Sequence, residues 1–278
     1  MKPISSPASS LPSPRWRTAS VLAALAGGGL LLLPPAIGEA PPETAHGNDE
    51  KAVEIARRAL DAMGGEEAWS STRYLRFDFF GFRLHHWDRH QGLHRLEGKT
   101  RDGQEYVVLS SLHESSEDNR KGRAWLDGEA LEGEALGEWL ERAHGAWVND
   151  TYWLLMPYKL LDPGVFLAYE GQEELDGRAY DKVKLTFENV GLTPGDTYWA
   201  WFDTETGLMH RWSYFLESWE EGREPTAWIW KDWGAYGSIQ LSPTRIKVDD
   251  ASQRELGRLA APEHLDPSVF TSPEPPAE

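Results

Sequence analysis

In the stretch Thr197–Lys231, TYWAWFDTETGLMHRWSYFLESWEEGREPTAWIWK, aromatic residues recur at the period of a β-strand, which predicts a series of strands. In three successive runs, aromatic side chains stand two residues apart and so share one face of a strand: Trp199 and Trp201, Trp212 and Tyr214, Trp228 and Trp230. Asp203–Gly207 predicts a tight hairpin between the first two runs, because Gly207 supplies a positive φ. We therefore expect neighbouring antiparallel strands whose rings meet across the strands.

Both faces of the first run are aromatic, since Tyr198 and Phe202 lie opposite Trp199 and Trp201. One interpretation is a packed aromatic core, and the other is a concave surface that holds a flat or apolar ligand. A sheet with one packed face leaves its other face in water. A helix, a ligand or another chain must therefore cover the second aromatic face, and the sequence does not choose the inward face.

Short β-rich runs, separated by turn residues, continue on both sides of this stretch. With the aromatic strands included, the expected strands are Tyr74–Phe82, Leu93–Lys99, Glu105–Ser110, Arg123–Leu126, Arg178–Glu188, Thr197–Asp203, Leu208–Glu217, Thr226–Lys231, Ser238–Leu241 and Thr244–Val248. Because strands and helices do not alternate as βαβ units, the pattern predicts an α+β fold with one antiparallel sheet and a few helices on one side.

Apolar residues at helical spacing, or in long aromatic and aliphatic runs, predict three helices: Glu50–Met63, Glu134–Ala143 and Val148–Leu161. The first follows Asn48-Asp49, whose side chains are suited to capping a helix, and ends at Gly64-Gly65. Gly145 closes the second helix. The third, which ends before Asp162-Pro163-Gly164, is expected to pack against the sheet.

The N-terminus has the pattern of a secretory signal peptide. Residues 1–20 carry three basic residues and no acid, Val21–Leu33 is uncharged and apolar, and Pro34-Pro35 follows. The apolar run is shorter than the about 20 residues of a membrane span, although an uncleaved anchor is the alternative. Small residues at Ala36 and Gly38 predict a signal peptide over residues 1–38 and an exported protein, either periplasmic or secreted.

The formal net charge is −17, from 28 Lys+Arg against 45 Asp+Glu, and becomes about −20 when the basic signal peptide is removed. This charge argues against nonspecific binding to nucleic acid or to an anionic membrane surface, because both need cationic patches. The sequence has no Cys, which excludes disulfides, thiolate metal ligands, Cys nucleophiles and a lipid-modified N-terminal Cys.

The mature chain is expected to contain a single domain. Residues 39–49 are predicted to form a flexible leader, and residues 50–250 the folded domain. Residues 251–278 are polar and predict a C-terminal extension with a disordered end at Ser272–Glu278.

Four of the nine histidines lie in Leu84–His94, which the sequence predicts to be a hairpin with its turn near Asp88–Gly92. His86 and His94 are expected to be able to approach each other across this hairpin, so an exported hydrolase or metal-dependent enzyme using the His85–His94 segment is an alternative function. Neither a third ligand nor a nucleophile motif such as G-x-S-x-G accompanies these histidines. We therefore expect them to be solvated, with no metal, no cofactor and no assigned catalytic residue.

Taken together, residues 50–248 resemble an uncharacterised family of exported bacterial proteins related to the LolA/LolB-like lipoprotein-carrier superfamily. The residues that carry this resemblance are Ala62–Trp69 leading into Leu75–Phe79, Trp153–Gly164 (WLLMPYKLLDPG), Leu175–Val183, Asp203–Leu208, and Asp232-Trp233 before the strands that end at Pro243. The resemblance implies an open half-barrel of antiparallel strands wrapped over helices, with an apolar cavity between them. It implies no catalytic residues.

In such carriers the cavity shields the acyl chains of lipoproteins and is usually lined by mixed aliphatic residues. This chain contains 14 Trp, so the resemblance implies an apolar ligand without specifying an acyl chain. We expect an exported, non-enzymatic protein whose partner is an apolar small molecule, a lipid or a lipoprotein. The expected pool of ligand-binding residues is Trp153, Tyr158, Trp199, Trp201, Trp212, Tyr214, Trp228 and Trp230. The second alternative function is that of a structural or interaction protein that binds another chain through the second aromatic face.

Overall fold

The computed structural model describes residues 47–116, 119–188 and 190–276. The expected signal peptide, and the expected leader as far as residue 46, lie outside the described residues. The helices are α1 (Glu50–Ala62), α2 (Gly65–Ser71), α3 (Gly133–Leu155) and two short 3-10 helices, η1 (Met156–Lys159) and η2 (Pro267–Phe270). In this part of the chain, no helix combines the length and the apolar content needed to cross a bilayer.

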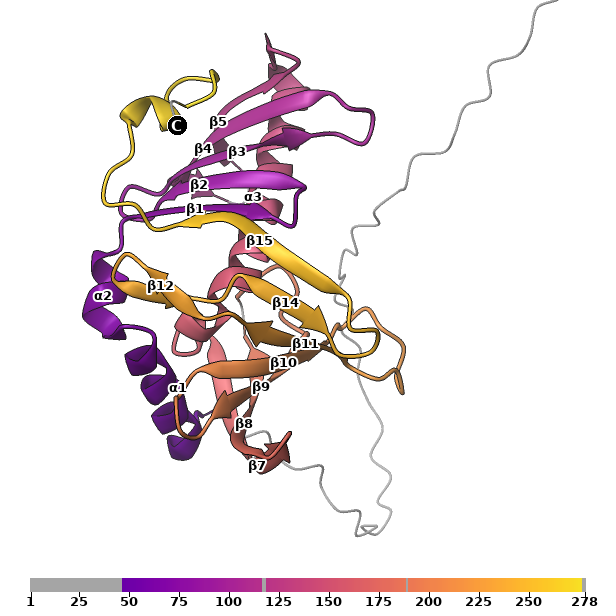
Figure 1. Cartoon of the computed structure of the whole chain (residues 1–278). Coiled ribbons are helices and arrows are strands. Elements are labelled where there is room, and N and C mark those ends of the chain that lie inside the picture. Colours follow the sequence, from indigo (N-terminus) through magenta and orange to yellow (C-terminus); the bar gives the residue numbers. More distant parts are fainter. Residues whose placement is uncertain (1–46, 117–118, 189, 277–278) are drawn as a thin grey trace, which may run out of the picture. The chain divides into compact units, whose positions relative to one another are not determined.

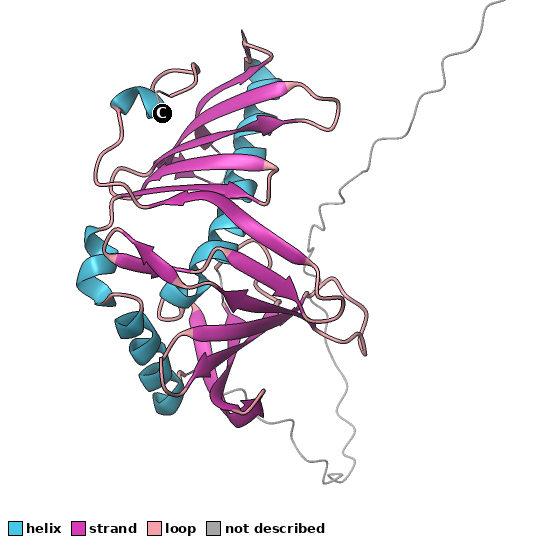
Figure 2. Ribbon diagram, in the orientation of Figure 1, coloured by secondary structure: helices cyan, strands magenta, loops and turns pink. Residues whose placement is uncertain are grey.

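One large antiparallel sheet dominates the described residues (Figures 1 and 2). Its 13 strands stand in the order β6-β5-β4-β3-β2-β1-β15-β14-β11-β10-β9-β8-β7. Their bounds are β1 (Tyr74–Phe79), β2 (Arg83–Asp88), β3 (Leu93–Lys99), β4 (Glu105–Ser116), β5 (Asn119–Leu126), β6 (Glu129–Ala130), β7 (Val165–Leu175), β8 (Arg178–Phe187), β9 (Thr197–Asp203), β10 (Met209–Phe215), β11 (Thr226–Lys231), β14 (Thr244–Lys247) and β15 (Gln253–Ala260). Strands β12 (Gly234–Tyr236) and β13 (Ile239–Leu241) form a separate hairpin.

The sheet is open, because β6 and β7 lie at its two edges and do not pair with each other. Helix α3 crosses its inner face, as Figure 1 shows, and packs against β4 and β5. Helix α1 contributes buried residues to the same interior as β7–β10. The predicted α+β class, an open antiparallel half-barrel with helices on the concave side, is confirmed.

The C-terminal strand β15 lies in the middle of the sheet, between β1 and β14. The expected domain boundary at residue 250 is therefore wrong, because the sheet includes Gln253–Ala260. Leu256 is the buried apolar residue of this strand, whereas Gln253, Arg254 and Glu255 are exposed. Backbone pairing rather than an apolar face holds β15 in place, so hydrophobic periodicity did not reveal it.

The chain after β15 is also ordered further than expected. The guanidinium of the fully buried Arg95 donates to the carbonyls of Ser272 (2.7 Å), Pro273 (3.2 Å) and Glu274 (3.1 Å). The prediction that the disordered end begins at Ser272 is therefore wrong for these residues, because a buried cation binds their backbone.

Helix α3 is continuous from Gly133 to Leu155, where two helices separated at Gly145 were predicted. A glycine that ends a helix adopts a positive φ, and Gly145 does not. Apolar residues on both sides of it pack against the sheet, which outweighs the cost of about 1 kcal/mol for glycine inside a helix. Strand β7, which was not predicted, follows directly after η1 and pairs with β8.

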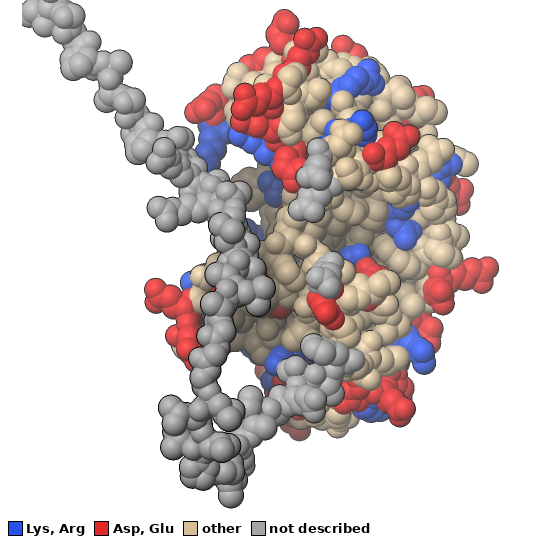
Figure 3. Space-filling view, turned by 180° about the vertical axis from the view of Figure 1, so that it is seen from behind, with Lys and Arg blue, Asp and Glu red and all other residues tan. Residues whose placement is uncertain are grey.

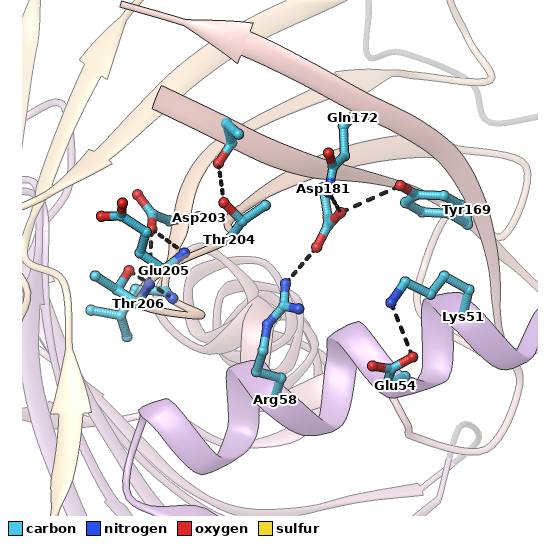
Figure 4. Close-up of polar contacts among 12 residues, drawn as sticks. Lys51, Glu54, Arg58, Tyr169, Gln172, Asp181, Asp203, Thr204, Glu205 and Thr206 are labelled. Carbon is cyan, nitrogen blue, oxygen red and sulfur yellow. Dashed lines mark hydrogen bonds and ion pairs between the residues drawn. The ribbon is translucent and has the colours of Figure 1, made fainter. Parts of the chain in front are cut away.

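Helix α1 is fastened to the β7–β8 hairpin by a polar group drawn in Figure 4. The Arg58 guanidinium lies 2.6 Å from the Asp181 carboxylate, which also accepts from Gln172 at 3.0 Å. In the hairpin at Asp203–Gly207, the Asp203 carboxylate accepts from the backbone N–H groups of Glu205 and Thr206, each at 2.9 Å. The predicted tight turn and the predicted Asp49 cap of α1 are both confirmed.

Candidate functional site

The aromatic residues of β10 and β11 meet α3 on the inner face of the sheet. The Trp153 ring of α3 lies 5.0 Å from Trp212 and 5.3 Å from Trp228, at interplanar angles of 79° and 78°. Trp230 lies 5.5 Å from Trp212, and both are only 1% exposed. We call Trp153, Trp212, Tyr214, Trp228 and Trp230 the aromatic cluster. It is a packed interior, as the first of the two interpretations predicts.

The indole N–H groups of Trp212 and Trp230 are buried without a hydrogen-bond partner among the described residues. The two rings meet at 77°, an edge-to-face arrangement in which the positive edge of one ring faces the negative face of the next. Contacts of this kind offset part of the cost of an unpaired N–H group. The cluster is therefore stabilised by aromatic contacts rather than by polar partners.

The opposite face of β9 is covered by charged side chains. Trp201 is 5% exposed, and its indole N–H donates to Glu173 at 2.7 Å. The Lys182 ammonium and the Arg211 guanidinium lie 5.2 Å and 4.8 Å from the centre of its ring. The aliphatic stems and cationic heads of Lys182 and Arg211 shield the Trp201 ring from water, so they cover the second aromatic face.

The inward face of β9 carries Tyr198 and Phe202, which belong to the interior that α1 and α3 cover. Trp199, two residues from Trp201 on the same strand, therefore lies on the outer face as well. The Tyr158 hydroxyl lies 2.9 Å from the Met63 carbonyl and 2.8 Å from the Gln240 carbonyl, and so joins the end of α1 to the β12–β13 hairpin.

The structure thus brings together five of the eight predicted ligand-binding residues. Tyr158 lies in a neighbouring core, and Trp199 and Trp201 lie across the sheet. None of the eight lines the cavity described below. That they hold a ligand stays a prediction.

A buried polar chain joins α3 to strands β2, β3 and β4. The Asp150 carboxylate of α3 accepts from Arg83 at 2.5 and 2.7 Å, from His85 at 2.8 Å and from Asn149 at 2.8 Å. His85 contacts His94 at 3.1 Å, and His94 contacts Ser110 at 3.4 Å. We call Arg83, Asp150, His85, His94 and Ser110 the polar chain.

With both imidazoles neutral, all hydrogen bonds of the polar chain can run in one direction, from Ser110 towards Asp150. If Ser110 donates to His94 and His94 donates to His85, then the remaining N–H of His85 points at Asp150, which assigns both tautomers. Burial lowers the pKa of both imidazoles, and it does so for His85 despite the opposing bond to Asp150. Burial alone raises the pKa of Asp150, but the bonds from Arg83 and His85 outweigh it and hold that pKa below its ordinary value.

Three of the four histidines in Leu84–His94 are buried rather than solvated, so that expectation is wrong for these three, whereas His90 is exposed. His85, His86 and His94 are exposed by 0%, 3% and 1%. His86 also points to the outer face, opposite Arg95, whereas His94 points to the inner face. The sheet separates them, so the expected approach of His86 to His94 does not occur. Among the described residues, no group of three or more His, Cys, Asp and Glu is arranged to hold a metal ion.

A cavity of about 490 Å³ lies beside the polar chain, between the middle of α3 and strands β2–β4. This volume falls within the roughly 300–1,000 Å³ typical of small-molecule sites. Leu96, Tyr106, Trp139 and Ala146 provide apolar surface, and the Tyr106 and Trp139 rings are 4.8 Å apart. The remaining lining residues are Arg83, Thr100, Arg101, Arg142, Gly145 and Asn149.

The cavity is lined by three arginines and by no Asp or Glu. Figure 3 shows a hollow on the face seen from behind, with Lys and Arg atoms as well as Asp and Glu atoms around it. The lining is therefore opposite in sign to the chain as a whole, whose formal net charge is −17.

Sequence reasoning singled out the segment that holds His85 and His94, but missed their partners in the polar chain and missed the cavity. Asp150 was the one available signal, because an acid inside the apolar run Val148–Leu161 requires a buried partner. The cavity has no comparable signal, since its residues come from strands β2, β3 and β4, from the β3–β4 turn and from the middle of a helix that was predicted to break at Gly145.

No protein-family model matches the chain, and no curated protein matches it. Among solved structures, the chain is similar to a LolA superfamily protein from Nitrosomonas europaea, with 10% identity over 79% of this chain and 96% of the other and a TM-score of 0.41. It is also similar to a domain of an outer membrane lipoprotein-sorting protein from Vibrio parahaemolyticus (10% identity, 80% and 96% covered, TM-score 0.42). A DUF1329 family protein from Desulfovibrio piger matches with 12% identity, 79% and 96% coverage and a TM-score of 0.42.

Proposed function

We propose that this chain is an exported binding protein that holds an apolar ligand in the cavity between α3 and strands β2–β4. The observation that carries the proposal is the cavity itself, which combines apolar walls with a few polar groups at fixed positions. Export rests on the signal-peptide pattern of residues 1–38. Binding here requires no covalent step, and the polar chain serves to fasten α3 beside the cavity.

The packing on either side of the cavity supports a preformed site. Leu96 is 3% exposed and Tyr106 is 9% exposed, so both are held by the core beneath the cavity. The Asp150 network fixes the same segment of α3 that supplies Ala146 and Asn149. Burial of an acyl or alkyl chain gains about 0.8 kcal/mol per CH₂, so part of one chain in this cavity gives measurable affinity.

The test is calorimetric titration of the purified chain with monomyristoylglycerol, a neutral single-chain lipid, below its aggregation concentration. Ala146→Phe places a ring inside the cavity and is expected to weaken binding at least tenfold. Ala135→Phe is the matched control, because Ala135 is exposed on the same helix and does not line the cavity. Circular dichroism verifies that both variants fold.

The titration also separates this site from the aromatic cluster. Trp139→Phe is expected to remove most of the fluorescence change on binding, whereas Trp212→Phe is expected to retain it. The proposal is overturned if monomyristoylglycerol shows no saturable binding, or if Ala146→Phe and Ala135→Phe bind it equally well. If Ala146→Phe does not fold, the fluorescence pair still decides the location, and loss of the signal in Trp212→Phe alone contradicts the proposal.

A further inference from the structure

The charges around the cavity are unusual for so acidic a chain. The sequence holds 45 Asp and Glu, yet three arginines and no acid line the cavity. Each arginine comes from a different element: Arg83 from β2, Arg101 from the β3–β4 turn and Arg142 from α3. Asp150 accounts for Arg83, but an apolar ligand by itself gives no reason for Arg101 and Arg142 at the same cavity.

The three guanidinium groups retain donors that no described residue uses. Arg83 binds Asp150 through Nε and Nη2, and its Nη1 makes no hydrogen bond to another described residue. Arg101 has no ion pair or hydrogen bond to another described side chain. Arg142 lies 3.7 Å from Glu138, and both are more than 60% exposed, a kind of pair that contributes little.

Neutral polar groups lie beside these cations. The Asn149 amide donates to Asp150 at 2.8 Å and keeps a second N–H. Burial raises the pKa of Tyr106, so its hydroxyl stays protonated and able to donate at neutral pH. The turn that carries Arg101 is itself held by backbone bonds from Thr100 to Gln104 (2.9 Å) and from Gly103 to Thr100 (3.1 Å).

We propose that the cavity selects an amphiphile with an anionic head, either a carboxylate or a phosphate, which the arginines bind while its chain lies against Leu96, Trp139 and Ala146. Arginine suits both heads because its planar fork donates two parallel bonds to paired oxygens. This inference rests on the proposed function and adds the class of ligand to it.

The experiment compares four probes with the same chain length by calorimetry: myristate, myristoyl lysophosphatidate, monomyristoylglycerol and tetradecyltrimethylammonium. We expect the anionic probes to bind at least tenfold more tightly than the neutral one, and the cationic probe to bind most weakly. The preference is expected to shrink as salt rises from 0.01 to 0.5 M, because exposed charges are screened. The tighter of the two anionic probes identifies the carboxylate or the phosphate as the preferred head.

The double variant Arg101→Gln/Arg142→Gln is expected to remove the preference for myristate over monomyristoylglycerol, both affinities being measured on the same variant. Arg57→Gln/Arg223→Gln is the matched control, because it removes the same charge from exposed positions outside the cavity. Equal affinities for the anionic and neutral probes, or an unchanged preference in Arg101→Gln/Arg142→Gln, overturn this inference alone. Failure of every probe to bind overturns the proposed function with it.

Discussion

The two ends of the sheet fill the space under α3 in opposite ways. In the aromatic half, formed by β7–β11 and the last turns of α3, aromatic rings in contact with one another fill the interior around Trp153. In the polar half, formed by β1–β5 and the middle of α3, the helix is held by charged and imidazole groups around Asp150. The polar half leaves a cavity of about 490 Å³ beside that attachment.

The two halves of the sheet therefore differ in the unfilled space that they leave beneath α3. Aromatic rings fill space at close to crystal density, so a cluster of them resists insertion of another molecule. A hydrogen-bonded attachment fixes a helix through a few atoms and does not need every gap to be filled. The 14 Trp of the sequence drew attention to the aromatic half, but the cavity between α3 and the sheet lies in the polar half.

The largest effect is expected from truncation of the aromatic cluster. Trp212→Ala removes a ring that is 1% exposed and contacts Trp153 and Trp230, and is expected to lower the free energy of unfolding by about 4 kcal/mol. Trp139→Ala, in the half-open wall of the cavity, is expected to cost about 1.5 kcal/mol. Urea denaturation measures both. Equal losses contradict the distinction between a closed half and an open half.

Removal of one charge from the polar chain is expected to have the next largest effect. Asp150→Asn leaves Arg83 without a carboxylate partner and is expected to cost about 3 kcal/mol, because it breaks a buried pair from one side. The control Asp162→Asn removes the partner of Lys159 in a half-exposed pair and is expected to cost about 0.5 kcal/mol or less. A loss in Asp150→Asn no greater than in the control contradicts the assigned role of the polar chain.

Acid is expected to destabilise the polar half first. Burial lowers the pKa of His86 to about 3, and Arg95 adds to this effect, whereas the unfolded chain titrates near 6.5. Between these two values the unfolded state binds the extra proton, so stability falls as pH falls, by about 1.4 kcal/mol per pH unit for this group. The lowered pKa values of His85 and His94 act in the same direction below about 6.5, and that of Asp150 acts likewise below its ordinary value of 3.8.

Urea midpoints measured from pH 7.5 to 4.5 test this prediction. His86→Gln is expected to give a shallower pH dependence than the wild-type chain, whatever its stability at pH 7.5. His113→Gln, on the exposed end of β4, is the matched control and is expected to keep the wild-type slope. Identical slopes for all three chains would show that His86 takes up its proton in the folded state at ordinary pH.

The smallest effect concerns the helix that spans both halves. Gly145→Ala is expected to stabilise the chain by about 0.7 kcal/mol, because Gly145 is inside α3 and its nearest neighbour to a new Cβ, Leu192, is 4.0 Å away. Gly137→Ala on the same helix is expected to have a similar effect, since nothing lies within 4 Å of its new Cβ. If Gly145→Ala is destabilising while Gly137→Ala is not, the helix is not regular at the cavity.

Aromatic residues that stand two positions apart made the aromatic strands predictable from the sequence. Trp228 and Trp230 differ in position by one strand period, so their shared face followed from the sequence, and so did the hairpin at Asp203–Gly207. Strand β15 was not predictable in this way, because its neighbours in the sheet and not its side chains place it between β1 and β14.

The candidate site was less accessible to sequence reasoning than the fold. The inward face of β9 depends on what covers each side, and Lys182 and Arg211 cover Trp201 from the neighbouring strands β8 and β10. The cavity is a volume that the side chains of α3 and of the neighbouring strands leave unfilled. Because no pattern of residue types in a sequence indicates an unfilled volume, the cavity could be found only in the folded structure.

The proposed function places the ligand in the polar half and not among the rings of the aromatic half. Photolabelling with a myristic acid that carries a diazirine on its chain, followed by peptide mapping of the wild-type protein by mass spectrometry, tests it most directly. We expect covalent labels within residues 96–106 and 139–149, which supply all the lining residues except Arg83, and competition by unlabelled myristate. Labels concentrated within residues 198–230, with none in the two cavity segments, would contradict it.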